Sequence, residues 1–253
     1  MSKRPLFSCV MPVKGDRPYM KEALESLVSQ GLSDDLEVII QDADVEPDQG
    51  QSDAFNKGFA KARGEWLFWL NADDVLLPGV LAKIAQICRT AGKSCDWVVA
   101  NTVYLDKDGV GQYTMWNKRW HGFIYRYLTV WSGGPSAFFR RELFEKIGGF
   151  DISLKYVMDI DLWTRMAKAG FRYKVVDFPV WGFRCHEGSL TASGKHRVEH
   201  EQERVRMLEK LGVRHLKLWR NVMRCVQLLD GSYLRRILTT RVVKGKHWKT
   251  LGV

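Results

Sequence analysis

The sequence lacks any apolar run long enough to cross a membrane. A transmembrane helix needs about 20 consecutive apolar residues, whereas the longest central run, Trp66–Leu70, has only the length of a strand. The N-terminus carries Lys3, Arg4 and Pro5 before a short apolar stretch, which is not the pattern of a secretory signal peptide. These absences argue against a membrane-spanning or secreted protein and predict a cytoplasmic one.

Cysteine is also scarce. The five cysteines are an odd number, and no two are spaced as CxxC. This usage is typical of reduced thiols and argues against a disulfide framework or a cysteine-based zinc site. The chain also has no internal repeat and no low-complexity tract. Its 253 residues, 45% of them hydrophobic, suffice for one large α/β domain or one domain with an appendage.

Acidic residues are lacking only toward the C-terminal end. Residues 1–194 hold 24 basic and 24 acidic residues, whereas residues 195–253 hold 15 basic and 5 acidic ones. We therefore divide the chain into a balanced globular domain, 1–194, and a basic helical extension, 195–253. The extension mixes its basic residues with apolar ones at helical spacing, which predicts attachment to an anionic membrane surface. A helix packed on the domain or on a second copy of the chain is the alternative. No nucleic-acid motif accompanies the charge, so no nucleic-acid partner is predicted.

Strand-like runs alternate with helical spacing over the first 90 residues. The runs predict strands over Leu6–Met11, Leu36–Ile40 and Glu65–Leu70. The helices between them are expected to start at Asp16 and at Ser52 or Asp53, acting as N-caps, and a third opens at Pro78. This alternation favours an α/β fold with a mostly parallel sheet flanked by helices and joined by right-handed crossovers.

The second half reads differently. The turn Asp106–Gly109 predicts a hairpin. The remaining predicted strands are Trp97–Leu105, Val110–Met115, Ser136–Phe139, Phe171–Phe178 and Val180–Cys185; the remaining helices are Arg140–Ile147, Asp159–Ala169 and most of the chain from His196. Six aromatic residues lie between Trp116 and Trp131, which suits either an ordinary core or an acceptor site that stacks on sugar rings.

Acids follow two of the predicted strands at their carboxyl ends. Asp42 follows the second strand, and Asn71-Ala72-Asp73-Asp74 follows the third. Ligands of open α/β sheets bind beyond these ends. Carboxylates there suit Mg²⁺ or Mn²⁺ when phosphates supply the remaining oxygens. The alternative is a helix N-cap, because Pro78 follows closely and acids favour helix starts.

Three blocks of the sequence form a recognisable pattern. The first spans Leu6–Gly79 and includes Phe7-Ser-Cys-Val-Met-Pro12, Glu37-Val-Ile-Ile-Gln-Asp42, Glu46–Gly58 and the strand that leads to Asn71-Ala-Asp-Asp74. The second is Gly148–Trp163, and the third is Phe183–Thr191. These blocks resemble family 2 glycosyltransferases of the GT-A fold; they cover roughly residues 6–191 and stand in the family's order. The family match implies an inverting transfer of a sugar from a nucleoside-diphosphate donor, UDP-linked by expectation, to a hydroxyl of a glycan or lipid-linked acceptor in bacterial surface polysaccharide synthesis.

The resemblance also implies roles for individual residues. Asp73 would bind the divalent cation, Mn²⁺ or Mg²⁺, with His186 as a further ligand; a structural role for His186 is the alternative. Arg184 and Ser189 would lie on the loop that closes over the diphosphate. The residues expected to bind the donor nucleotide are Pro12, Val13, Asp42, Asp53, Asn71 and Ala72.

Asp159 stands where the family has its general base, and Trp131 and Asp161 are expected on the acceptor side. A base that takes the acceptor proton contributes about 10²–10⁴ in rate. The alternative for Asp159 is a helix cap, since Leu162, Trp163 and Met166 follow at core spacing.

The sequence departs from the family pattern at two points. Asn71 replaces the first acid of the DxD motif, so one negative charge is missing. Only Ala43-Asp44-Val45 separates Asp42 from Glu46, so about one helix–strand unit beside the nucleobase is absent. Two rivals follow: a sugar nucleotidyltransferase, which the loop Val13–Arg17 fits poorly, and a non-catalytic nucleotide-binding scaffold.

Overall fold

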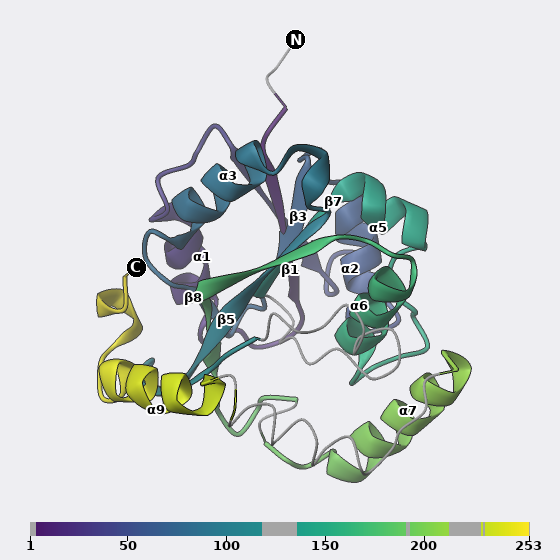
Figure 1. Cartoon of the computed structure of the whole chain (residues 1–253). Helices are drawn as coiled ribbons and strands as arrows, with labels where there is room; N and C mark the ends of the chain where they lie inside the picture. Colours follow the sequence, from purple (N-terminus) through teal and green to yellow (C-terminus); the bar gives the residue numbers. More distant parts are fainter. Residues whose placement is uncertain (1–3, 118–135, 191–192, 213–228, 230, 253) are drawn as a thin grey trace.

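The computed structural model describes residues 4–117, 136–190, 193–212, 229 and 231–252. These residues form one mixed sheet with helices packed on both faces, as Figure 1 shows. The strands are β1 (Phe7–Val13), β2 (Leu36–Asp42), β3 (Trp66–Trp69), β4 (Val75–Leu76), β5 (Trp97–Leu105), β6 (Gly111–Met115), β7 (Ala137–Arg140) and β8 (Tyr173–Arg184).

The helices follow the strands in alternation over the first half of the chain, as predicted. They are α1 (Met20–Val28), α2 (Gln51–Ala60), α3 (Val80–Thr90), α5 (Arg141–Ile147), α6 (Met158–Lys168), α7 (Arg197–Lys210) and α9 (Ser232–Val243), with short 3₁₀ turns at Gly92–Ser94 and Trp248–Thr250. The α/β fold class is confirmed.

The sheet runs in the order β2-β1-β3-β7-β5-β8-β4, with β6 paired to β5. Strands β1, β2 and β3 are parallel to one another, β7 runs antiparallel to both of its neighbours, and β5 is parallel to β8. The sequence lacks a helix–strand unit after Asp42. Because β2 is an edge strand, the absence of that unit does not interrupt the rest of the sheet. The outer side chains Val38 and Ile40 of β2 are 38% and 43% exposed.

Each face of the sheet has its own apolar core. Helices α1 and α3 pack on one face and helices α2, α5 and α6 on the other (Figure 1). Helix α2 lies so close to β1 that a Cβ atom on Gly58 would come within 2.4 Å of Val10 Cγ1. Strand β1 is buried along almost its whole length, as expected of a parallel strand covered on both faces.

Four local predictions were wrong. Helix α1 begins at Met20, and neither Asp16 nor another side chain caps it. Helix α2 begins at Gln51 after Gly50, so Ser52 and Asp53 lie inside its first turn rather than capping it. The helix predicted over Asp159–Ala169 is Met158–Lys168, one residue earlier, so Asp159 lies in its first turn and the alternative of a helix cap does not hold.

The fourth concerns β8, which is one strand rather than two. The sequence suggested a break at Pro179, but Pro179 pairs opposite Asn101 where the register with β5 shifts. A proline in a strand is tolerated at such an irregularity because the ladder hydrogen bond is already missing there.

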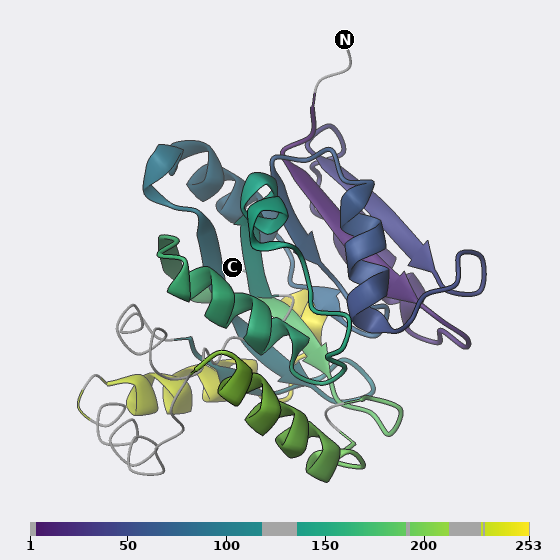
Figure 2. The same ribbon diagram turned by 90° about the vertical axis from the view of Figure 1, so that its right-hand side faces the viewer.

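The C-terminal residues pack against the rest of the chain. Val243, Trp248 and Leu251 belong to the core on the α1 side of the sheet, and the Trp248 indole N–H donates to Glu22 at 3.2 Å. Met207 and Leu208 of α7 pack against Val157, just before α6. Figure 2 shows α7 and α9 flanking the lower part of the molecule. The division at residue 194 stays a prediction, and both sides of it share apolar contacts. Within the described residues, no helix is long and apolar enough to span a bilayer.

Candidate active site

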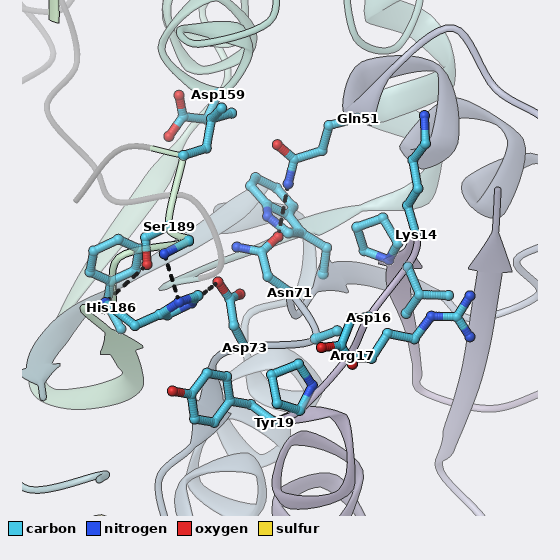
Figure 3. Close-up of a pocket in the computed structure, with 18 of the residues that line it drawn as sticks. Lys14, Asp16, Arg17, Tyr19, Gln51, Asn71, Asp73, Asp159, His186 and Ser189 are labelled. Atoms are coloured by element: carbon cyan, nitrogen blue, oxygen red, sulfur yellow. Dashed lines mark hydrogen bonds and ion pairs between the residues drawn. The ribbon is translucent and has the colours of Figure 1, made fainter. Parts of the chain in front are cut away.

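A pocket of about 350 Å³ opens at the carboxyl ends of β1 and β3. Its walls come from the loop after β1, the first residue of α2, the loop after β3, the segment entering α6, and the loop after β8. Eight of the predicted site residues line it: Pro12, Val13, Asn71, Ala72, Asp73, Asp159, His186 and Ser189. Three sequence blocks that are far apart along the chain therefore converge on one cavity (Figure 3).

Asp73 and His186 meet directly in this pocket. His186 Nε2 lies 3.0 Å from Asp73 Oδ2, and the other ring nitrogen, Nδ1, accepts the N–H of Gly188 at 3.2 Å. An Nδ1 that accepts leaves the proton on Nε2, so the ring donates to the carboxylate. Among the described residues, Asp73 Oδ1 then receives no hydrogen bond, and the side chain is 32% exposed. This oxygen fits a divalent cation that takes its other ligands from a diphosphate.

Asn71 is held in a fixed orientation at the pocket wall. Its Oδ1 accepts from Gln51 at 3.0 Å, and its Nδ2 donates to Asp74 at 2.9 Å. Asp74 is fully buried and also accepts the backbone N–H of Arg184 at 2.9 Å. Burial, followed by the neighbouring charge of Asp73, raises the pKa of Asp74 well above its ordinary value. Asp74 therefore joins the β3 loop to β8 rather than facing the pocket.

Asp159 lies in the first turn of α6 and faces the same cavity. Its helix is anchored by Trp163, one turn later on the same face. The Trp163 ring stacks between Trp69 and Trp97, with centroids 5.6 and 5.1 Å away. Because Trp69 also lines the pocket and ends β3, this stack fixes Asp159 relative to the loop of Asp73. Burial raises the pKa of Asp159 to about 6, which suits a group that takes a proton near neutral pH.

Arg184 does not line the pocket. Its guanidinium is 1% exposed and donates to Glu22 at 2.6 Å and to the carbonyls of Asp73 and Lys107 at 3.0 and 2.9 Å. It also lies 4.5 Å from the centroid of the Tyr19 ring. With its donors engaged in this way, Arg184 holds the backbone of Asp73 instead of facing a diphosphate.

Three other predicted residues also lie outside the lining. Asp42 pairs with Arg17 at 2.7 Å, and Asp53 pairs with Lys57 at 3.1 Å. Asp161 is 1% exposed and accepts from Arg165 at 2.7 Å; burial raises its pKa although that arginine lowers it. The roles of these three residues stay predictions. Trp131 lies outside the described residues.

Several lining residues were not predicted from the sequence. They are Lys14, Asp16, Arg17, Tyr19, Gln51, Lys155 and Tyr156. The first four directly follow β1, and the carboxyl end of that central strand was a signal as good as those of β2 and β3. Lys155 and Tyr156 lie just before Asp159 in a block that was already singled out. Lys14 and Lys155 bring positive charge to a pocket that also holds Asp16, Asp73 and Asp159.

Comparison with known proteins agrees with this geometry. The profile of the family described as Glycosyl transferase family 2 matches residues 44–148. The chain is 23% identical over 219 residues to an uncharacterized glycosyltransferase of Rickettsia typhi, covering 77% of this chain and 69% of that protein. It is 24% identical over 226 residues to the O-antigen biosynthesis protein RfbC of Myxococcus xanthus, covering 77% of this chain but 17% of that protein.

Solved structures show the same fold. Residues 1–349 of TarS from S. aureus, in complex with UDP-GlcNAc, align with a TM-score of 0.62 at 18% identity, covering 84% of this chain and 68% of that one. A mannosyltransferase from Pyrobaculum calidifontis, in complex with GDP-Man and Mn²⁺, aligns with a TM-score of 0.55 at 19% identity, covering 81% of this chain and 65% of that one. At these identities the likeness concerns the fold.

Proposed function

Because this chain is a family 2 glycosyltransferase of the GT-A fold, we propose that it transfers a sugar from a nucleoside-diphosphate donor to an acceptor hydroxyl, with inversion, in bacterial surface polysaccharide synthesis. The observation that carries the proposal is that Asp159 and Asp73 line the same pocket; burial raises the pKa of Asp159 to about 6. A proton acceptor and a cation ligand in the same cavity are what such a displacement requires.

The bonds change in one step. The acceptor oxygen attacks the anomeric carbon of the sugar while the bond from that carbon to the diphosphate oxygen breaks. The diphosphate leaves with the electron pair, and the acceptor proton passes to the Asp159 carboxylate. In the described part of the pocket the other carboxylates are Asp16 and Asp73. Asp73 is engaged by His186, and Asp159, whose pKa is raised by burial, stands at the position of the family's base.

We assign donor binding to the part of the pocket formed by the loops after β1 and β3. Pro12, Val13, Asn71 and Ala72 would contact the nucleotide, and a UDP-linked sugar is the donor we favour. Asp73 would hold a divalent cation, Mn²⁺ or Mg²⁺, which supplies positive charge to the leaving diphosphate. Lys14 and Lys155 add positive charge to the same pocket. The hydrogen bonds of His186 favour its orienting Asp73 over direct metal ligation.

A binding screen followed by one variant tests the function. We expect UDP together with Mn²⁺ to raise the melting temperature more than either alone. We expect Asp159→Asn to keep that response while losing release of UDP from UDP-sugars in the presence of lipid-linked acceptor extracts. Pyrophosphate release from a nucleoside triphosphate and a sugar phosphate would instead indicate the nucleotidyltransferase. Absence of any metal-dependent nucleotide binding would indicate the scaffold.

We also propose that the basic C-terminal end attaches the enzyme to the inner face of the cell membrane, close to a lipid-linked acceptor. Leu234, Leu238 and Val242 lie on one side of α9 and are 61%, 52% and 59% exposed. The exposed cations Arg241 and Lys244 accompany them. Apolar residues beside cations are the composition of helices that lie in an anionic interface.

Vesicle sedimentation tests the attachment. The chain should co-sediment with vesicles containing phosphatidylglycerol and not with pure phosphatidylcholine. Leu238→Asp combined with Arg241→Glu should abolish the co-sedimentation without changing nucleotide binding. Equal binding of wild type and variant to both kinds of vesicle would contradict the proposal.

A further inference from the structure

A buried glutamate on α7 contacts the backbone of the segment that leads into α6. Glu203 is 4% exposed. Its two carboxylate oxygens each accept one backbone N–H, Oε1 from Lys155 at 2.5 Å and Oε2 from Tyr156 at 2.7 Å. A carboxylate that receives two backbone donors in a buried position makes strong, charge-assisted hydrogen bonds. Glu203 lies almost 50 residues further along the chain than the segment it holds.

The segment it holds has few hydrogen bonds of its own. Residues 150–157 connect α5 to α6 and form no helix or strand. Side chains of other elements satisfy the backbone there. Ser52 of α2 donates to the carbonyl of Leu154 at 2.6 Å, and Asn56 of α2 exchanges two bonds with the backbone of Phe150. Glu203 completes this set at the end nearest the pocket, where unpaired N–H groups before a helix would otherwise need water.

Apolar packing also joins α7 to the segment before α6. Met207 and Leu208 of α7 contact Val157, with Leu154, Tyr156 and Ile160 against them. The rings of His196 and His200 lie 5.5 and 6.3 Å from the Tyr156 ring. Figure 2 shows α7 running beside α6. Lys155, Tyr156, Met158 and Asp159 all line the pocket, so the backbone that Glu203 holds is the wall that carries the proposed base.

We infer that Glu203 is a positioning residue for the transfer step: it fixes the Lys155–Asp159 wall and thereby aims the Asp159 carboxylate at the acceptor hydroxyl. The inference rests on the proposed function of Asp159. The charge pattern had placed α7 in the basic extension. Through Glu203, this helix would instead contribute to the active site. The residues proposed to contact the donor nucleotide, Pro12, Val13, Asn71 and Ala72, belong to the loops after β1 and β3, so we expect nucleotide binding to depend little on Glu203.

The variant Glu203→Gln tests this with little change in shape. The amide offers one acceptor oxygen and turns an N–H₂ group toward the second backbone N–H, so one bond is lost. We expect faster amide hydrogen exchange in peptides covering residues 154–160 and unchanged exchange in α3. The apparent Kd for UDP in the presence of Mn²⁺, measured by thermal stabilisation, should change by less than a factor of two. The kcat for UDP release should fall about tenfold at constant KM for the donor, since small misplacements of a catalytic group have effects of this order.

Glu209→Gln on the exposed side of the same helix is the matched control and should match wild type in every measurement. If Glu203→Gln yields no folded protein, Glu203→Asp, which keeps the charge but is one methylene shorter, is judged by the same measurements. Unchanged exchange over residues 154–160, or a loss of nucleotide binding equal to the loss of kcat, would overturn the inference. Failure of the proposed function is separate: it would appear as full activity of Asp159→Asn.

Discussion

His186 Nε2 donates to Asp73 Oδ2 across 3.0 Å, and this single bond joins the loop after β8 to the loop after β3. Two cis ligands of one octahedral Mg²⁺ or Mn²⁺ would also lie about 3 Å apart, given metal–ligand distances near 2.1 Å. The separation therefore suits both roles of the histidine. The N–H of Gly188, which points at Nδ1, favours the orienting role, because a metal-bound ring normally donates from its second nitrogen.

Substitutions of these two residues should separate ligand from orienting partner. Asp73→Asn should abolish the stabilisation by UDP that depends on Mn²⁺. His186→Ala should weaken the apparent Mn²⁺ affinity by about 10–100-fold, the usual cost of losing a group that orients a ligand. His186→Gln can still donate an N–H and should recover part of that loss. Titration of the melting temperature with Mn²⁺ at saturating UDP measures all three. A complete loss in both His186 variants would make the histidine a ligand.

Restoring the acid that family members usually have at position 71 should not improve the site. The Asn71 amide donates to the buried Asp74 at 2.9 Å. In Asn71→Asp that donor is lost and two carboxylates face each other, which costs about 1–3 kcal/mol of stability. We expect a lower melting temperature at pH 8 and no tighter Mn²⁺ binding. Asn56→Asp is unsuitable as a control because Asn56 also donates to a backbone carbonyl; Gln86→Glu, on the exposed face of α3, serves instead. Tighter Mn²⁺ binding by Asn71→Asp would refute this expectation.

Much of the fold and of the pocket was predictable from the sequence. The alternation of buried strands and amphipathic helices up to Thr90 depends on local spacing, and acids at the ends of parallel strands point to one edge of the sheet. The three sequence blocks were enough to predict that Asp73, Asp159 and His186 belong to one site, and all three line the pocket. The positions that failed depend on contacts between distant parts of the chain. Arg184 looked free to bind phosphate because its partners, Glu22 and the carbonyl of Lys107, are more than 70 residues away.

The contribution of Glu203 could not be predicted for the same reason. Its neighbours in sequence are charged residues of a solvated helix, and nothing local indicates that one of them is buried against residues 155 and 156. Capping also failed as a guide. Helices α1, α2 and α6 start without a side-chain cap, and so do α3, α5, α7 and α9.

Arg184 should prove more important for stability than for contact with substrate. In Arg184→Met the carbonyls of Asp73 and Lys107 lose buried donors, and Glu22 loses its cation. We expect a loss of about 2–4 kcal/mol in the free energy of unfolding, together with weaker Mn²⁺ binding because the Asp73 backbone is released. Arg172→Met is the matched control, since Arg172 also pairs with an acid, Asp96, but its side chain is 56% exposed. This substitution should lower the free energy of unfolding by less than about 1 kcal/mol. Urea unfolding measures both. Equal losses in the two variants would contradict a special role for Arg184.

The ionisation of Asp159 should affect activity and stability in opposite directions. The base must be ionised, so kcat/KM should rise with pH through about 6, where its pKa lies in the folded protein. The ordinary pKa of the group is 3.8, so the folded state binds the proton more tightly than the unfolded state does. This contribution to stability is therefore full below pH 3.8 and is lost as the pH rises through 6. Asp159→Asn removes the cost of a partly buried charge and should stabilise the protein by about 2 kcal/mol at pH 8, with no gain at pH 4.

Asp151→Asn provides the control of opposite sign. Burial alone would raise the pKa of Asp151, but hydrogen bonds from Lys210 and Ser153 lower it to about 2. The ionised form is the one that stabilises the fold, so this substitution should destabilise the protein at pH 8 and have little effect at pH 2. Thermal unfolding of the two variants across this pH range gives the comparison. If Asp159→Asn were also destabilising at pH 8, its carboxylate would be satisfied by partners in the fold, and the case for a poised base would be lost.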